Sequence, residues 1–566
     1  MDIVRGVPRY TLEDYETTFR ERHLVPGAVE YWAARKPDST ALIHAGTGQR
    51  VSWRALDQTA TALAGQLLRM GLGKGDFFAT SLPFLLEHVF LEYACFKAGI
   101  IHAPLDLRLK PEEVVRSIGL IQAKAYAFFG RTPAADFGEL GRAVKQSCPS
   151  VQKLIQFAPP GETIPGAVSA SELLARAQNQ GPIALPAIGR DDGAQVIFTT
   201  GSTGYPKPAL LSHRSITCQN MCLGGGFGFG EQSRLLVNLP PSHVGGQSEL
   251  LMSALYWGGS VVVLPVFDPA ASLRAIHEHK VTLLGQIPAM FNLEWRLSSY
   301  REYDLSSLEA VLYGGQQVAR PFLERLAQMA PLFGTGLGLT EASGFCTYTR
   351  LDGTVDEIAA SIGHSMPVYP LSIREPMRED GSAGRELPDS EVGHVCFKGP
   401  QTFLGYVGDP DATRKAVSQD GFLYTGDMGF QDEDGLHFSG RAKWVLKPAG
   451  NMVFPGQVEN HFCALSEKVA ACGVVGAEHA LFSEGIVAYV ETKPGAELTE
   501  QELRQHARQL TSYMRPLHYV ILPPGGLPLN RVVKTDYVRL SEMAREEVEK
   551  LRERRRWDRR PGGSIE

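Results

Sequence analysis

An apolar, strand-like run leads into a cluster of hydroxyl and glycine residues and then into a lysine. The segment from Val196 to Lys207 has the sequence VIFTTGSTGYPK. Hydroxyls, backbone N–H groups and a fixed cation suit polyphosphate oxygens, and glycines let the backbone approach a ligand. A Walker loop requires Gly-Lys-Ser/Thr in succession, whereas Lys207 follows Tyr205 and Pro206. The segment therefore predicts a phosphate-binding loop of another kind, with a flexible turn as the alternative.

Further motifs follow this loop in a fixed order. With it, they resemble the motifs of the adenylate-forming superfamily of acyl-CoA synthetases, peptide-synthetase adenylation domains and luciferases. The resemblance runs from about Pro26 to Leu540 and is strongest to stand-alone acyl-CoA synthetases. It implies that the loop binds the outer phosphates of ATP, with contacts from Thr199, Thr200, Gly201, Ser202, Thr203, Gly204 and Lys207.

Two segments resemble the parts of the family that border the acyl and adenine pockets. In PPSHVGG, residues 240–246, the resemblance implies that His243 borders the acyl group. A lone histidine is otherwise more often a core residue. In YGGQQ, residues 313–317, it implies that the strand end passes the adenine ring, with contacts from Gly314, Gly315 and Gln316.

The segment GLGLTE, residues 336–341, resembles the family motif that meets the metal and the α-phosphate. The resemblance implies that Glu341 holds the Mg²⁺ of Mg-ATP and that Thr340 hydrogen-bonds the α-phosphate. A carboxylate is a suitable ligand for such a hard cation. Leu337 stands where the family usually has an aromatic residue stacked on adenine.

Two more motifs resemble the ribose site and the hinge of the family. The resemblance implies that Asp427 of YTGD binds the ribose hydroxyls. A carboxylate accepts stronger hydrogen bonds from these hydroxyls than a neutral group does. It implies that Arg441 adds a ribose or phosphate contact and that Lys443 is the hinge. It also places Lys447 to Gly450 at the thioester-forming site, with Lys447 as a catalytic candidate.

The segment LPLNRVVK, residues 527–534, resembles the motif of the catalytic lysine, here Lys534. A cation at the α-phosphate during carboxylate attack would stabilise the transition state. Two residues depart from the family pattern: Val533 and Pro208 each replace a usual glycine. Proline fixes φ and removes a donor, so we expect a stiff exit from the phosphate loop.

The elements around these motifs predict an α/β fold. A helix is expected from Trp53 to Leu68, followed by a strand at Phe77–Leu82, a helix at Glu87–Lys97 and a strand at Ile100–Pro104. This alternation indicates parallel α/β layers. Buried strands are expected again after the phosphate loop, at 235–239 and 261–264.

We expect a large N-terminal domain of layered α/β subdomains, residues 1–442, with the ATP and acyl pockets. A small, mobile α+β domain, residues 443–566, would carry the catalytic lysine. It shows a βαβ-like pattern over the segments 458–465, 472–475 and 486–490, followed by a helix at 500–510. The charged segment from Ala544 to Arg560 predicts a solvated helix, with a polybasic membrane or partner contact as the alternative.

Composition narrows the functional class. At 566 residues the chain is long enough for two to four domains, and its net charge of −6 does not favour nucleic acid as a partner. No apolar run is long enough to span a membrane, and the first residues lack a signal peptide, so we expect a cytoplasmic protein. The eight cysteines include no Cys-x-x-Cys pair and predict neither a zinc site nor a disulfide framework.

These residues predict an ATP-dependent acyl-CoA ligase with ATP, Mg²⁺ and coenzyme A as cofactors and cosubstrates. Two alternatives are an enzyme that loads a carrier protein and a non-catalytic acyl- or nucleotide-binding relative. A homodimer is left open as the assembly. The acyl pocket candidates mix small and polar side chains and favour an aliphatic, alicyclic or aromatic monocarboxylate over an amino acid. They are His243, Gly246, Gln247, Gly314, Gly315, Gln316 and Leu337.

Overall fold

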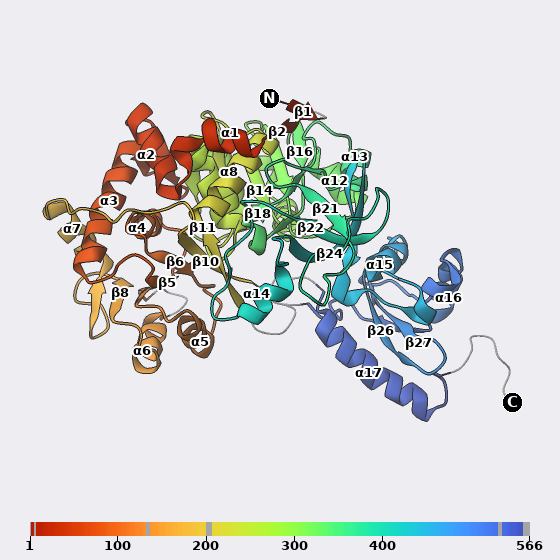
Figure 1. The fold of residues 1–566 in the computed structure, drawn as a ribbon. Helices are drawn as coiled ribbons and strands as arrows, with labels where there is room; N and C mark the ends of the chain where they lie inside the picture. Colours follow the sequence, from red (N-terminus) through yellow and green to blue (C-terminus); the bar gives the residue numbers. More distant parts are fainter. Residues whose placement is uncertain (1, 5–6, 132–135, 200–205, 530–534, 559–566) are drawn as a thin grey trace.

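Two large, mostly parallel sheets form the body of the molecule, and a smaller lobe lies at the carboxyl-terminal end (Figure 1). The structure is a computed structural model that describes residues 2–4, 7–131, 136–199, 206–529 and 535–558. The mixed α/β architecture confirms the predicted fold class. The division after residue 442 stays a prediction.

The first large sheet has eight strands in the order β23-β11-β10-β6-β5-β7-β8-β9. Strands β5 to β9 and β10 run parallel to their neighbours, whereas β11 is antiparallel to both β10 and β23. The strands are β5 (Phe77–Ser81), β6 (Ile101–Pro104), β7 (Ala125–Phe129), β8 (Lys153–Phe157), β9 (Ala167–Ser169), β10 (Gly193–Thr199), β11 (Lys207–Ser212) and β23 (Gly405–Tyr406).

The second large sheet has seven strands in the order β16-β15-β14-β12-β13-β3-β4. All its pairs are parallel except β3 with β4. The strands are β3 (Thr40–His44), β4 (Arg50–Ser52), β12 (Arg234–Val237), β13 (Ser260–Val263), β14 (Leu283–Gln286), β15 (Ala310–Tyr313) and β16 (Leu332–Gly334).

Helices pack on both sheets, and their apolar faces form the cores. The predicted helices near the amino terminus are α3 (Trp53–Arg69), which begins at the N-cap Ser52, and α4 (Leu86–Lys97). The helix α8 (His213–Phe227) is buried along most of its length. The other helices of this part are α1 (Leu12–Thr17), α2 (Val25–Arg35), α5 (Pro111–Ile121), α6 (Gly138–Ser147), α7 (Ala170–Asn179), α9 (Ser253–Tyr256), α10 (Pro269–His279), α11 (Pro288–Trp295), α12 (Arg320–Leu326), α13 (Val355–Ala360) and α14 (Pro410–Ala416).

A four-stranded antiparallel sheet follows, in the order β21 (Leu371–Arg374), β22 (Gly393–Phe397), β24 (Leu423–Asp432) and β25 (Gly435–Arg441). Strands β24 and β25 hold the predicted ribose and hinge motifs in register, with Asp427 opposite Arg441. Two two-stranded pairs complete this region: β17 (Gly338–Leu339) with β18 (Gly344–Phe345), and β19 (Thr347–Tyr348) with β20 (His364–Ser365). A further pair at the amino terminus joins β1 (Asp2–Val4) to β2 (Val7–Arg9).

The carboxyl-terminal lobe contains the sheet β26 (Val469–His479), β27 (Ser483–Thr492) and β28 (His518–Leu522), with α15 (Pro455–Cys463), α16 (Glu500–His506) and α17 (Tyr537–Glu553). The expected βαβ pattern is wrong for the first two strands, which form an antiparallel hairpin, and right for β27 and β28, which are parallel across α16.

The charged carboxyl-terminal segment is also not the solvated helix that we expected. Helix α17 begins earlier, at Tyr537, and is amphipathic. Its residues Leu540, Ala544, Val548 and Leu551 are buried in a cluster with residues of β26 and β27. The helix is therefore a packed part of this lobe.

Candidate active site

The predicted phosphate loop connects two paired strands. Strand β10 ends at Thr199 and β11 begins at Lys207, and these two residues are register partners. Thr200, Gly201, Ser202, Thr203 and Gly204 lie outside the described residues. The hairpin fixes where the loop leaves and re-enters the sheet, and it places Lys207 beside the loop.

Buried polar contacts hold the strand before this loop. The Gln195 amide of β10 donates to Glu92 of α4 at 2.9 Å, and both side chains are fully buried. Burial raises the pKa of Glu92 to about 7. On the other side of the loop, the backbone oxygen of Pro208 accepts from Val407 N–H at 2.9 Å, so this departure from the family pattern is accommodated in β11.

The predicted metal ligand lies beside the phosphate-loop lysine. Glu341 is half-buried in a short 3₁₀ turn, Thr340–Ala342. Its Oε1 accepts from the Tyr406 hydroxyl at 2.6 Å, and Lys207 Nζ lies 5.1 Å from the centre of the Tyr406 ring. Tyr406 thus links the Glu341 carboxylate to the Lys207 ammonium. Burial, with Glu341 close by, raises the pKa of the Tyr406 hydroxyl above its ordinary value, so it remains a donor.

The predicted ribose residues form an ion pair. Arg441 Nε lies 2.9 Å from Asp427 Oδ1; the Asp427 side chain is 3% exposed and that of Arg441 56%. Arg441 also donates to the Thr425 backbone oxygen at 3.2 Å, and Thr425 Oγ1 accepts from Asp427 N–H at 3.1 Å. The carboxylate is therefore fixed in one orientation, and the exposed guanidinium side faces solvent.

The predicted adenine contacts lie just after the carboxyl end of strand β15 in the second large sheet. Gly314, Gly315 and Gln316 follow the end of β15, and Gly315 has φ +89°, which favours glycine. Leu337 is half-buried, and its N–H donates to Thr347 Oγ1 at 2.8 Å. A β-carbon on Gly336 would meet the Thr347 backbone oxygen at 1.9 Å, so the backbone here is packed too closely for a side chain.

His243 lies just before a π-helical segment, Gly245–Met252, which we call the π-segment. The histidine is exposed, and its Nδ1 accepts from Gly245 N–H at 3.0 Å. An accepting Nδ1 leaves the proton of a neutral ring on Nε2. The adjacent Gly246 is packed against backbone: a β-carbon there would lie 2.6 Å from the Pro240 oxygen.

Two residues near these groups were not predicted as site residues. Tyr406 is one, and Glu249 of the π-segment is the other. A β-carbon on Gly338, in the GLGLTE motif, would lie 3.2 Å from Glu249 Oε1. The buried Cys346 is close enough to Glu249, Asp427 and Glu341 for all three carboxyls to raise its thiol pKa, after burial itself. Glu249, the predicted ribose residue Asp427 and the predicted metal ligand Glu341 therefore all lie near the same buried thiol.

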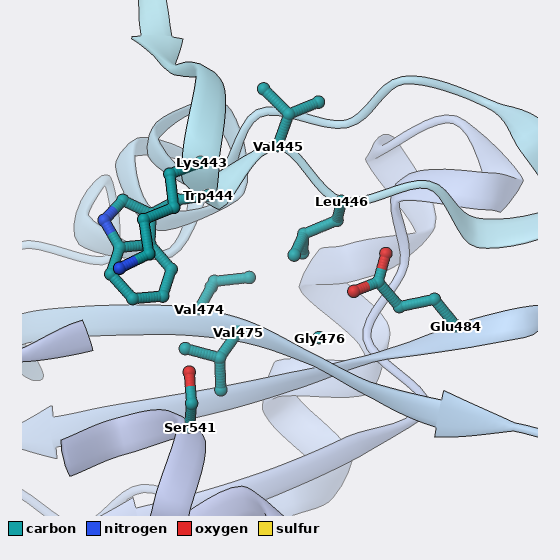
Figure 2. A pocket seen from close by; sticks show the side chains of 9 residues that line it. All are labelled: Lys443, Trp444, Val445, Leu446, Val474, Val475, Gly476, Glu484 and Ser541. Atoms are coloured by element: carbon teal, nitrogen blue, oxygen red, sulfur yellow. The ribbon is translucent and has the colours of Figure 1, made fainter. Parts of the chain in front are cut away.

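The predicted hinge segment, residues 443–446, lines a cavity of about 160 Å³ together with residues of the carboxyl-terminal lobe. Lys443 and Trp444 lie at one side of it and Glu484 at the other (Figure 2). The Trp444 ring stacks on Tyr537 with a centroid distance of 5.4 Å. Tyr537 in turn donates to the carboxyl of Glu459 at 2.9 Å. The hinge therefore packs directly against the start of α17.

Lys447 is exposed, and its backbone N–H donates to Glu484, while Ala449 N–H donates to Phe482 O at 2.8 Å. The structure thus joins this segment to the carboxyl-terminal sheet. The predicted catalytic residue Lys534, with Val533, lies outside the described residues. The chain on either side of it is tied together by a bridge between Leu529 and Thr535 and by Asp536 N–H donating to Pro528 O at 2.9 Å.

In the described ranges no group of three or more His, Cys, Asp or Glu side chains is arranged to hold a metal. All eight cysteines are free, and seven are buried. No helix in the same part of the chain has both the length and the apolar character needed to cross a membrane.

Comparisons with known proteins agree with these motifs. The profile of the AMP-binding enzyme family matches residues 29–407, and that of the AMP-binding enzyme C-terminal domain matches residues 457–534. The feruloyl-CoA synthase of an Amycolatopsis species is 29% identical over 498 residues, which cover 86% of this chain and 93% of the relative. The 4-coumarate–CoA ligase 2 of rice, Oryza sativa subsp. japonica, is 26% identical over 518 residues, or 86% and 87%.

A solved structure has the same fold. The ATP-bound MatB of Rhodopseudomonas palustris superposes with a TM-score of 0.78 at 23% identity, covering 92% of this chain and 99% of MatB. The first family profile alone matches well over half of this chain. The chain therefore belongs to the AMP-binding enzyme family, the adenylate-forming superfamily that its motifs predict.

Proposed function

We propose that this chain activates a monocarboxylic acid in two steps at one site, with separate residues serving each step. It is an ATP-dependent acyl-CoA ligase, an AMP-forming acid–thiol ligase: the family and the CoA ligases among its relatives support this activity. The proposal adds the roles of the individual residues.

In the first step a carboxylate oxygen of the acid attacks the α-phosphorus of ATP. The bond to the β-phosphate oxygen breaks, pyrophosphate leaves, and an acyl-adenylate remains. Lys207 and the phosphate loop bind the outer phosphates, and Thr340 donates to the α-phosphate. Lys534 provides the cation at the oxygens that gain charge in the transition state.

Asp427 and Arg441 bind the ribose. Asp427 is held by its ion pair, and its carboxylate would accept hydrogen bonds from the ribose hydroxyls. Leu337 and the backbone at Gly314, Gly315 and Gln316 would provide the faces against which adenine packs. His243 would donate from Nε2 to the acid at the border of the acyl pocket.

The Glu341 carboxylate fits the Mg²⁺ that this family implies. The Tyr406 hydroxyl holds one of its oxygens, and the carboxylate lies half-buried beside the phosphate-loop lysine. One protein carboxylate together with phosphate oxygens is a common donor set for Mg²⁺. The ion, when bound, would neutralise charge on the phosphates.

In the second step the thiolate of CoA attacks the acyl carbon. The carbon–oxygen bond to AMP breaks, and AMP leaves with the bridging oxygen. The carboxyl-terminal domain, residues 443–566, would rotate about Lys443, remove Lys534 and present Lys447 to Gly450. The stack of Trp444 on Tyr537 supports such coupling, because it joins the hinge to the helix that follows the Lys534 segment.

The single observation that most supports the first step is the grouping of Lys207, Tyr406 and Glu341. Three segments far apart in the chain place a cation, a fixed donor and a carboxylate together. Such a group matches the alternating charges of a metal–polyphosphate complex better than it matches a structural ion pair, because Lys207 and Glu341 both remain partly accessible.

A screen of carboxylic acids tests this function. AMP and pyrophosphate release are measured for each acid with CoA, with a phosphopantetheinylated carrier protein, and with neither. We expect acid-dependent pyrophosphate release and a thioester formed with free CoA. A thioester formed only on the carrier would favour the loading enzyme. Absence of acid-dependent release across the panel would favour the non-catalytic alternative.

A further inference from the structure

A carboxyl group that the proposed mechanism does not use lies beside the nucleotide motif. Glu249 belongs to the π-segment, six residues after His243. Glycines from three segments pack against its side chain. A β-carbon would lie 3.2 Å from its Oε1 at Gly338, 3.5 Å from its Oε2 at Gly245 and 2.8 Å from its Cγ at Gly344. Because these residues have no side chains, their backbones pack closely against the Glu249 side chain.

The Glu249 carboxyl has no protein partner in the part of the chain that the structure describes. Within the described residues, no hydrogen bond or ion pair reaches Glu249 Oε1 or Oε2, and the side chain is only partly accessible. Burial raises its pKa to about 8. An unpaired carboxyl in such surroundings is unfavourable for folding, and a purely structural role would be filled better by an apolar side chain.

An unpaired donor lies next to this unpaired acceptor. Gln219 of α8 is fully buried, and its Oε1 accepts from Asn220 Nδ2 at 3.0 Å. This bond fixes the orientation of the amide, and Nε2 is left without a partner among the described residues. A β-carbon on Gly344 would lie 2.8 Å from both Gln219 Nε2 and Glu249 Cγ. The Gln219 amide and the Glu249 side chain therefore both lie against Gly344.

These two side chains lie on the acyl side of the site. Gly338 precedes Thr340 and Glu341 by two and three residues, and Gly245 follows His243 by two. Glu249 therefore lies between the segment predicted to meet the α-phosphate and the segment predicted to border the acyl group. A group bound here would belong to the part of the acid that extends away from its reacting carboxylate.

We infer that Glu249 and Gln219 select an acid with a hydroxyl group on its acyl part, which donates to the Glu249 carboxyl and accepts from Gln219 Nε2. A hydroxyl can donate and accept at once, whereas an amino group on an aromatic ring donates but accepts poorly and a methyl ether can only accept. This inference rests on the proposed function and names its substrate class.

The test compares acids that differ only at this group. Benzoate, phenylacetate and 3-phenylpropenoate are each assayed with hydrogen, hydroxyl, methoxy and amino at the distal ring position, with pyrophosphate release as the readout. We expect the hydroxylated acid of the best-fitting skeleton to exceed its unsubstituted counterpart about 100-fold in kcat/KM, because the unsubstituted acid leaves buried polar groups unpaired.

Glu249→Met removes the acceptor at similar length and should reduce this preference to about threefold or less, by raising activity on the unsubstituted acid, with KM for ATP unchanged. Gln219→Leu tests the donor in the same assay, also in the case that Glu249→Met does not fold. Glu278→Gln, on the exposed face of α10, is the matched control and should retain the preference.

Equal turnover of hydroxylated and unsubstituted acids would overturn this inference. So would a preference for the acid with an amino group on its ring. So would a Glu249→Met effect on KM for ATP alone, because the carboxyl would then contact the nucleotide. These results differ from failure of the proposed function, in which no acid supports pyrophosphate release by the unaltered chain.

Discussion

The two ends of the candidate site differ in how their polar side chains are paired. At the nucleotide end, Tyr406 donates to Glu341, and Arg441 pairs with Asp427. At the acyl end, Glu249 and Gln219 Nε2 have no partner in the described part of the chain. Preformed pairs suit a cosubstrate that is the same in every turnover, whereas unpaired groups await a partner that only the correct acid supplies.

The largest expected effect at the nucleotide end is that of Lys534→Ala. We expect pyrophosphate release to fall about 1000-fold or more, because the transition state loses its cation, and thioester formation from pre-made acyl-adenylate to change less than about tenfold. Rapid-quench assays of each half-reaction measure both. Lys550→Ala, on the exposed face of α17, serves as the control. Equal loss of both half-reactions would show that Lys534 does not serve the first step alone.

Asp427→Asn should have the next largest effect. It leaves Arg441 without its ion pair and weakens the acceptor for ribose, so KM for ATP should rise about 10- to 100-fold. Steady-state kinetics with saturating acid measure this change. Asp411→Asn, which removes an exposed Asp–Arg pair on α14, should leave KM for ATP unchanged. An unaltered KM for ATP in Asp427→Asn would show that Asp427 does not bind the ribose.

Tyr406→Phe removes one hydrogen bond to Glu341 and keeps the ring beside Lys207. Because a hydrogen bond to a charged group contributes about 1.5–3 kcal/mol, we expect about a tenfold rise in the Mg²⁺ concentration needed for half-maximal rate. A Mg²⁺ titration at fixed ATP measures it. The exposed Tyr513→Phe is the control. A Mg²⁺ dependence that stays the same would separate Tyr406 from the predicted metal ligand.

The smallest expected effect concerns the stability of the acyl end. Burial raises the pKa of Glu249 from 4.5 to about 8, so the folded protein binds this proton more tightly than the unfolded chain. Stability is then lost as the pH rises from about 4.5 to 8. The nearby Cys346 and Tyr348, whose pKa values are raised well above their ordinary range, stay neutral in that interval.

Glu249→Gln has no proton to lose. Its Tm relative to that of the unaltered chain should therefore increase by about 2 °C or more between pH 5 and pH 8. Calorimetry at both pH values measures this difference, and Glu278→Gln should show no such change. A difference in Tm that is independent of pH would mean that Glu249 already has a partner.

Sequence motifs point to candidate residues at the nucleotide end more readily than at the acyl end. Glu341, Asp427 and Arg441 lie in short motifs whose spacing is visible along the chain. Tyr406 does not, because it reaches Glu341 only through the pairing of the two-residue strand β23 with β11. Glu249 lies in a mostly apolar helical run, and its significance depends on glycines about 90 residues away that the fold brings beside it.

In the carboxyl-terminal lobe, too, the sequence pattern did not reveal the strand pairing. The turn between β26 and β27 contains Ala480, Leu481 and Phe482, which give no glycine or proline signal, and the left-handed position falls on Ser483 at φ +62°. Its antiparallel pairing was therefore not predicted. The buried face of α17 was visible as apolar residues three and four apart, but the surrounding charges obscured it.

Isotope transfer tests the central chemical claim most directly. The acid is labelled with ¹⁸O at both carboxylate oxygens and incubated with the enzyme, ATP and CoA. Mass spectrometry then measures the ¹⁸O content of each product. Carboxylate attack on the α-phosphorus followed by thiolate attack on the acyl carbon predicts one ¹⁸O in AMP, one in the thioester carbonyl and none in pyrophosphate. Release of ADP with label in inorganic phosphate would contradict the account, because the acid would then have attacked the γ-phosphorus.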